Sequence, residues 1–376
     1  MPTHRFEEPS TSASVFSTAF DGHRSPVSEW GVNVAGGLHN QTRVKRSVAT
    51  AAQATSVAAP AAGSEQGAME KRVSSWSWTF KNQPFNIYIE EWGPSDSEEA
   101  VLFLPALSDV STTDEFRKVA EAVAGSGRRA VALDWPGFGL SGRPQMEYSS
   151  DLLVKFIGDF VSASNGPLAK SQTVSIVGAG HSPSLVVKAI KQGLLSAKAL
   201  IAVAPTWAGP LPIVFGREPK VQNRYNILRT VLRSPGLGWA LYKFVLSSPK
   251  NIRNQYRTHV YSSKDNITDD LINIRTELTQ REGARFAPAA FVTGDLDPYL
   301  TRDELLSDIA SLDSKVPLFV LKSIQSPKRS KAEMDALKGV KGVAEYGDVP
   351  GALLPHEEFP QEVATKVLGF LDGLKK

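Results

Sequence analysis

Apolar and polar positions follow two different periods along the chain from residue 76 onward. Short apolar runs of strand length are followed by longer segments whose apolar side chains recur on one helical face. The expected strands are residues 76–80, 85–91, 101–104, 130–133, 173–177 and 200–204, the first two as an antiparallel pair. The expected helices are residues 114–125, 152–162 and 185–195. This alternation predicts an α/β fold with a mostly parallel sheet flanked by helices.

The alternation stops after the sixth expected strand. Residues 207–286 contain no convincing strand, several helical patterns and many aromatic residues, which predicts an inserted helical cap. One helix is clear, because Thr268 is a good N-cap and Asp269 and Asp270 follow in the first turn. The remaining expected elements are two strands and a closing amphipathic helix, at residues 317–321, 343–346 and 361–374. The expected organisation is a targeting and linker segment, a first core half, the cap and a second core half, at residues 1–70, 71–206, 207–286 and 287–376.

Composition narrows the chemistry that the chain can perform. It has 376 residues and no cysteine, which excludes disulfides, thiol nucleophiles and cysteine-ligated metals. Its six histidines show no metal-ligand spacing, so we expect neither a metal nor another cofactor.

Residues 199–216 carry no charge over 18 positions, close to the length of a membrane span. Because Pro205, Pro210 and Pro212 interrupt this run, we expect a buried strand and an apolar loop rather than a transmembrane helix.

The N-terminal segment has a different composition from the rest. Residues 30–64 contain no Asp or Glu, are rich in Ala, Ser, Thr and Val, and include Arg43, Lys45 and Arg46. An acid-poor, Ser-rich and basic segment is typical of an organellar transit peptide. No long apolar stretch precedes it, which argues against a secretory signal. We expect cleavage near residues 46–51, followed by a linker.

The main candidate for chemistry is a turn between an expected strand and an expected helix. Residues 174–184 read VSIVGAGHSPS, which is the pattern of a nucleophile elbow. In one register Ser182 is the nucleophile, and Pro183, which has no N–H, removes one oxyanion donor. In the other register Gly180 occupies the nucleophile position, His181 follows it, and there is no nucleophile. Ser182 also suits an N-cap with Pro183 as the first helical residue.

A second motif carries a family resemblance. The run DWPGFGLSGRP at residues 134–144 resembles the loop after the fourth strand in α/β-hydrolases with a cap, the class of epoxide hydrolases, haloalkane dehalogenases and many esterases. The resemblance covers about residues 76–376 and implies the α/β-hydrolase fold. More narrowly, residues 328–358 resemble plant and cyanobacterial α/β-hydrolase-like proteins. This implies a chloroplast protein, in the stroma or peripheral to the thylakoid or envelope, with the mitochondrion as the alternative address.

The resemblance also implies roles for individual residues. Matched to the family's pattern, Ser182 is the nucleophile, Asp297 its acid and His356 the general base, in the family's chain order. The Leu107 N–H is the first oxyanion donor, because Pro105 and the next residue stand where the family has its His-Gly pair.

Two of these roles stay open. Asp297 lies in a GDLDP sequence like the family's acid loop, whereas Ser326 takes the acid's place if residues 317–321 are the penultimate strand. Ser326 is closer to His356 along the chain, which favours a site without an acid. His356 is either the base or a surface or capping histidine beside two glutamates.

Together these features favour a chloroplast α/β-hydrolase-fold protein with weak or absent ester or acyl hydrolase activity. Such a protein would bind a small apolar or acyl ligand under the cap, or a partner. The alternative is an active, esterase-like serine hydrolase that uses Ser182, Asp297 and His356. Epoxide hydrolases and dehalogenases need a nucleophilic aspartate, and neither elbow register supplies one.

The expected cap is strongly basic. Residues 207–285 carry 13 Lys or Arg and 6 Asp or Glu, interleaved with aromatic residues. Ordinary helices with solvated basic faces would explain this pattern. It also fits contact with an anionic membrane surface or an acidic protein, through basic steering and aromatic anchoring. We expect no nucleic acid as partner, because no recognised binding module accompanies the charge.

Overall fold

The computed structural model describes residues 70–312 and 316–374. The targeting segment predicted over residues 1–70 lies outside the described residues, except for Glu70.

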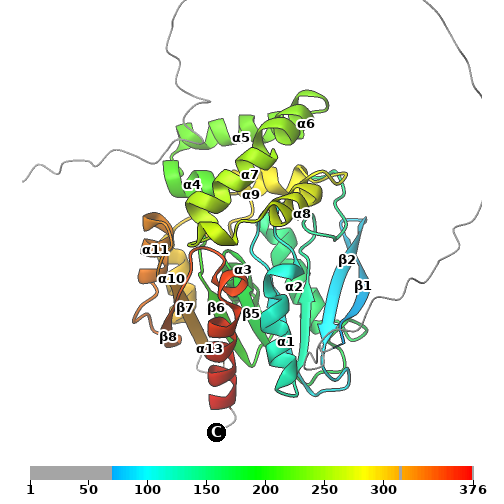
Figure 1. Cartoon of the computed structure of the whole chain (residues 1–376), viewed down its shortest axis with the longest axis vertical. Coiled ribbons are helices and arrows are strands. Elements are labelled where there is room, and N and C mark those ends of the chain that lie inside the picture. The colour runs from blue at the N-terminus through cyan, green and yellow to red at the C-terminus, as the bar shows by residue number, and fades with distance from the viewer. Residues whose placement is uncertain (1–69, 313–315, 375–376) are drawn as a thin grey trace, which may run out of the picture. The chain divides into compact units, whose positions relative to one another are not determined.

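An eight-stranded sheet forms the centre of the described chain, in the order β1-β2-β4-β3-β5-β6-β7-β8 (Figure 1). The strands are β1 (Arg72–Phe80), β2 (Gln83–Trp92), β3 (Glu99–Leu104), β4 (Arg129–Leu133), β5 (Thr173–Ala179), β6 (Ala199–Val203), β7 (Leu318–Ser323) and β8 (Val343–Val349). β2 runs antiparallel to both of its neighbours, and all other strand pairs are parallel. The predicted α/β fold with a mostly parallel sheet is therefore confirmed.

Helices cover both faces of the sheet (Figure 1). On one face lie α1 (Arg117–Gly125) and α13 (Pro360–Gly373), which pack against each other. On the other lie α2 (Ser150–Ser162), α3 (Ser182–Lys191) and α10 (Arg302–Ala310). The short helices η2 (Thr113–Phe116), α11 (Lys328–Asp335) and α12 (Pro355–Glu358) follow strands β3, β7 and β8.

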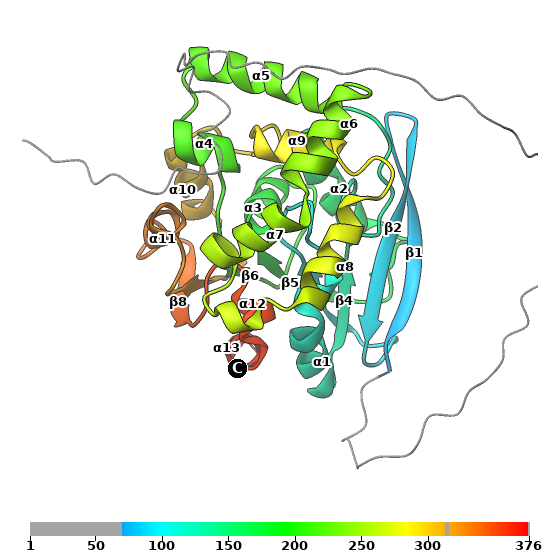
Figure 2. The same ribbon diagram turned by 45° about the horizontal axis from the view of Figure 1, so that its top comes forward.

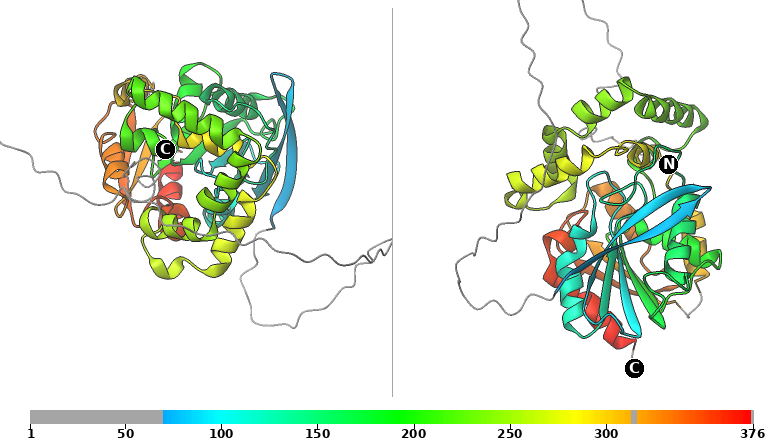
Figure 3. Two further views of the ribbon diagram at one scale, coloured as in Figure 1. Left: turned by 90° about the horizontal axis from the view of Figure 1, so that it is seen from above. Right: turned by 90° about the vertical axis from the view of Figure 1, so that its right-hand side faces the viewer.

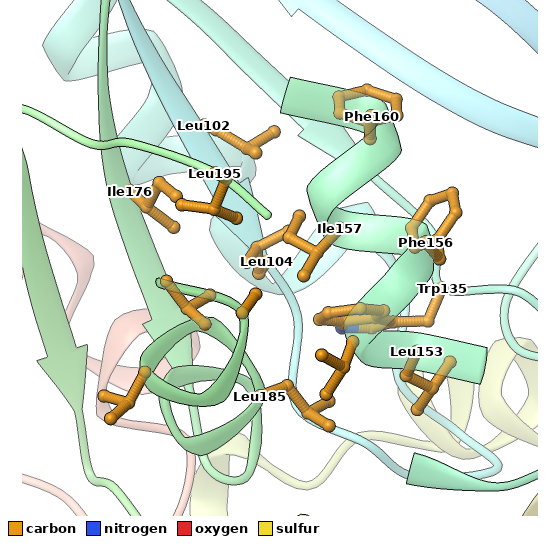
Figure 4. Close-up of a cluster of buried hydrophobic side chains, with 14 of the residues drawn as sticks. Leu102, Leu104, Trp135, Leu153, Phe156, Ile157, Phe160, Ile176, Leu185 and Leu195 are labelled. Carbon is orange, nitrogen blue, oxygen red and sulfur yellow. The ribbon is translucent and has the colours of Figure 1, made fainter. Parts of the chain in front are cut away.

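Alternate strand residues enter two separate cores, because successive side chains of a strand point to opposite faces. Leu102, Leu104 and Ile176 pack against α2 and α3, together with Trp135 (Figure 4). Their neighbours in the strands, such as Phe103, pack against α1 and α13. Burial on both faces explains why these strands are continuous apolar runs in the sequence.

The cap follows β6 and lies over the edge of the sheet at which that strand ends (Figures 1 and 2). It consists of α4 (Pro210–Phe215), α5 (Pro219–Arg233), α6 (Leu237–Leu241), η3 (Tyr242–Leu246), α7 (Pro249–Gln255), η4 (Tyr256–Val260), η5 (Lys264–Asn266), α8 (Asp269–Thr279) and α9 (Phe286–Val292). The predicted N-cap of α8 is confirmed, since Thr268 Oγ1 accepts a hydrogen bond from the Leu271 N–H at 3.1 Å. No helix in the described part of the chain is long and apolar enough to cross a membrane.

Candidate functional site

Gly180 makes the sharp turn between β5 and α3. β5 ends at Ala179, and Gly180 has a φ of +54°, a left-handed conformation that favours glycine. A Cβ at this position would lie 3.3 Å from the Ala106 Cβ, so the turn is closely packed against the loop after β3. A nucleophile elbow places its nucleophile on this strained strand-to-helix turn. Here that place holds a residue without a side chain.

Ser182 is the first residue of α3 and is fully buried. Its Oγ donates a hydrogen bond to the Pro105 carbonyl at 2.5 Å and accepts one from Trp135 Nε1 at 3.1 Å. Trp135 Nε1 also donates to Pro105 O at 3.0 Å, so the three groups form a closed triangle. The helix's N-cap is His181, one residue earlier than the N-cap interpretation of Ser182, and Pro183 lies in the first turn.

His181 and Asp297 come together in a buried pair. His181 Nε2 lies 3.5 Å from Asp297 Oδ1, and His181 Nδ1 shares a 2.9 Å hydrogen bond with Thr206 Oγ1. The Phe291 ring packs edge-on against the imidazole at a centroid distance of 4.9 Å. Sequence reasoning treated His181 only as part of the elbow. It missed this pair because the two residues lie far apart along the chain.

The cap and α11 complete the surroundings of Asp297. Asp297 Oδ2 accepts hydrogen bonds from the Gly209 N–H at 2.8 Å and from the Arg217 guanidinium. Glu333 accepts a weak hydrogen bond from the Trp207 N–H at 3.4 Å. Burial raises the pKa of Glu333 to about 8, and the nearby Asp297 carboxylate adds to the rise. We call His181, Thr206, Arg217, Asp297 and Glu333 the His181 cluster.

His356 lies in a second buried group, on α12 after β8. Its ring stacks on Phe116 at a centroid distance of 4.1 Å and an interplanar angle of 21°. Its Nε2 lies 3.4 Å from Glu115 Oε2, which also accepts from the Ala106 N–H at 3.1 Å. His356 is fully buried, so the alternative of a surface histidine is wrong. Its Nδ1 has no hydrogen-bond partner among the described residues.

The two candidates for the acid occupy different places. Asp297 follows helix α9 rather than a strand, and β7 is the strand that precedes β8 along the chain. The loop after β7 reads Ile-Gln-Ser-Pro, with Ser326 Oγ hydrogen-bonded to Ser323 Oγ at the strand's end. That loop contains no carboxylate. The partner nearest to His356 is instead Glu115, from the 3₁₀ helix after β3.

The structure therefore distributes the predicted site residues over three groups. Ser182 bonds to the loop after β3, Asp297 belongs to the His181 cluster, and His356 faces Glu115. Within residues 70–312 and 316–374, no hydrogen bond or ion pair joins Ser182 to Asp297 or His356. Leu107 is buried in the loop after β3, and its N–H bonds to no described residue.

The surface hollow and the arrangement of possible metal ligands show whether a ligand or a metal ion could bind near the predicted catalytic residues. A surface hollow of about 240 Å³ lies elsewhere and is lined by Asn86, Leu140, Ser141, Gly142, Arg143, Arg281 and Glu282. None of the predicted catalytic residues lines it. Among the described residues, no group of three or more His, Asp or Glu side chains is arranged to hold a metal ion.

Comparisons with known proteins identify the fold. The sequence matched no family model and no curated protein. Similar solved structures include Cfl2 from Burkholderia cenocepacia, at 17% identity over 79% of this chain and 95% of that one, with a TM-score of 0.58. The haloalkane dehalogenase DatA from Agrobacterium tumefaciens matches at 15% identity over 80% and 97%, with a TM-score of 0.55. A serine hydrolase involved in carbazole degradation, CarC, matches at 17% identity over 80% and 99%, with a TM-score of 0.54. Strand order, cap position and these likenesses agree, and the chain has the α/β-hydrolase fold.

Proposed function

We propose that this α/β-hydrolase-fold protein does not hydrolyse esters through a serine nucleophile and acts by binding a partner. The conformation of the strand-to-helix turn carries the proposal. Gly180 holds the left-handed turn, and the hydroxyl nearest to it along the chain, that of Ser182, is buried and donates a hydrogen bond to a backbone carbonyl. A serine nucleophile must reach its substrate and bond to its general base.

The positions of the other two candidates support the same conclusion. A catalytic triad acts as a unit, and its members lose most of their effect when one is missing. Asp297 is held by Arg217 and the Gly209 N–H, and His356 faces Glu115. Asp297 Oδ2 and His356 Nε2 each face local neighbours rather than Ser182, which supports a structural role for both residues.

A binding role places the function on the surface of the protein rather than at the elbow. The basic cap is the surface that the sequence singles out, and we propose a chloroplast location on the strength of the N-terminal composition. A small apolar ligand under the cap is the weaker choice, because the hollow of about 240 Å³ beside cap residues Arg281 and Glu282 is lined mostly by polar and charged side chains.

The test is hydrolysis of p-nitrophenyl butyrate by the purified full-length chain, together with labelling by a fluorophosphonate. We expect no turnover above that of heat-denatured protein and no adduct by intact mass. The Ser182→Ala variant should behave in the same way and unfold with a loss of about 1 kcal/mol, because Pro105 O keeps the Trp135 hydrogen bond.

Ser184→Ala is the matched control, because Ser184 is also buried in the first turn of α3 and donates to the His181 carbonyl. A fluorophosphonate adduct on Ser182, together with turnover that Ser182→Ala abolishes and Ser184→Ala preserves, would refute the proposal and establish a serine hydrolase.

A further inference from the structure

The outer cap carries an unusual concentration of exposed apolar side chains. Twelve large apolar residues are exposed in the described chain, and six of them lie between residues 215 and 245. Four form a compact stretch on α6 and η3: Leu237 is 67% exposed, Phe244 64%, Val245 54% and Trp239 46%. With Lys243 they make up the cap patch. Large contiguous apolar patches on a soluble protein mark interaction sites.

The cap patch combines aromatic rings with a cation. The Trp239 and Phe244 rings meet edge-on at a centroid distance of 5.6 Å. Lys243 Nζ lies 5.0 Å from the Trp239 centroid and 5.8 Å from that of Phe244. Tryptophan favours the boundary between an apolar phase and water, and lysine covers apolar surface with its stem while its charge stays in water. The patch therefore has the chemistry of an interfacial anchor.

The charge around the patch has one sign. Residues 219–264 contain nine Lys or Arg and no Asp or Glu. Three of the nine pair with acids from outside this stretch: Arg229 with Asp295, Arg233 with Glu147 and Arg253 with Asp269. The other six form no ion pair with any described residue: Lys220, Arg224, Lys243, Lys250, Arg257 and Lys264.

Four of these cations lie on the patch or on the helices that adjoin it: Lys243 in the patch, Lys220 and Arg224 on α5, and Lys250 on α7. Lys220 and Arg224 are exposed on α5, which packs against α6, and Lys250 is exposed in the first turn of α7, which contacts η3. Figures 1 and 3 place α5 and α6 in the part of the cap that faces away from the sheet. A flat surface could therefore meet the patch and its basic surroundings without contact with the core.

We propose that the cap patch docks the protein on an anionic lipid bilayer, with Trp239 and Phe244 in the interface and the unpaired cations of α5, η3 and α7 against the headgroups. An acidic protein would satisfy the charges alone, whereas a bilayer offers an anionic layer directly above an apolar one. The proposal rests on the proposed function only in giving the cap a binding role.

The experiment is co-sedimentation of the full-length chain with phosphatidylcholine vesicles, with and without phosphatidylglycerol, at low and high salt. We expect binding only to the anionic vesicles, and we expect high salt to weaken it because it screens the charges. Combined Lys220→Glu, Lys243→Glu and Lys250→Glu changes should lower the partition coefficient about 100-fold or more. Combined Trp239→Ala and Phe244→Ala changes should lower it about tenfold.

The controls are Leu300→Ala and Lys366→Glu, which change an exposed apolar and an exposed basic residue outside the cap and should leave binding unchanged. Absence of binding to anionic vesicles, equal binding to neutral ones, or full binding by both cap variants would overturn the proposal. So would capture by polyglutamate without any vesicle binding, which would indicate an acidic protein. All variants keep Ser182, Asp297 and His356, so the hydrolysis assay tests the proposed function separately.

Discussion

At the scale of single residues, one backbone angle distinguishes the two interpretations of the elbow. Gly180 and Ser182 both lie among small residues, and either could be placed at the turn from the sequence. The positive φ of Gly180 and the short hydrogen bond from Ser182 to Pro105 appear only in three dimensions. The pairing of His181 with Asp297 was equally inaccessible, because the cap returns the chain to the elbow after more than a hundred residues.

Burial of Glu333 makes the free energy of unfolding depend on pH. Its pKa is 4.5 when exposed and rises to about 8 through burial. Between these values the unfolded chain loses the proton while the folded protein keeps it, so Glu333 lowers the free energy of unfolding progressively from about pH 4.5 to pH 8. Glu333→Gln removes this dependence and keeps an acceptor for the Trp207 N–H.

We therefore expect Glu333→Gln to match the wild type near pH 4.5 and to exceed its free energy of unfolding by about 2–4 kcal/mol at pH 8. Urea denaturation across this pH range measures the difference. A constant difference at every pH would show that Glu333 titrates normally in the folded protein.

At the scale of elements, the hydrophobic period predicted most of the sheet. Strands buried on both faces are short, continuous apolar runs that are easy to recognise. The predicted antiparallel pairing of the first two strands is confirmed by β1 and β2. The sequence left the position of the catalytic acid open for a related reason. Residues 286–292 read FAPAAFV, a run that period alone cannot assign, and they form helix α9 rather than a strand before Asp297.

A buried ion pair between two elements links the cap to the core. Arg275 of α8 pairs with Glu357 of α12, and Arg275 is only 1% exposed. Removal of one partner leaves a buried charge without compensation, which costs about 3–5 kcal/mol. We expect such losses for Arg275→Met and for Glu357→Gln, and a much smaller loss for the double variant.

A double-mutant cycle in guanidinium chloride measures the coupling between them. Thr268→Ala, which removes only the N-cap of α8, is the control and should cost about 1 kcal/mol. Losses for the double variant equal to the sum of the single ones would mean that the pair does not hold the cap.

At the scale of the whole molecule, positive charge is concentrated in the cap, and the sequence alone shows this. The cap is basic as predicted from composition, but which cations are neutralised could not be read from the sequence. Arg229, Arg233 and Arg253 find acids outside the acid-free stretch, whereas Lys243 lies over two aromatic rings. Only the folded cap separates the cations that pair with acids from those that form no ion pair with any described residue.

The composition of the N-terminal segment predicts the organelle into which the protein is imported. Residues 30–64 lack acids and carry Arg43, Lys45 and Arg46, and an import machinery recognises basic, acid-free segments. Residues 1–70 fused to a fluorescent protein should therefore direct it to chloroplasts in plant cells, and removal of the segment should leave a new N-terminus between residues 47 and 67. The fused protein's N-terminus, determined by mass spectrometry, locates the cut.

The matched control reverses the three basic residues to Glu and leaves the length unchanged. Because it gives the segment the acids that transit peptides avoid, the reporter should stay in the cytosol. Mitochondrial fluorescence would select the alternative address. Cytosolic fluorescence of the unaltered fusion would contradict organellar import, and the basic cap would then have to find its anionic surface outside the chloroplast.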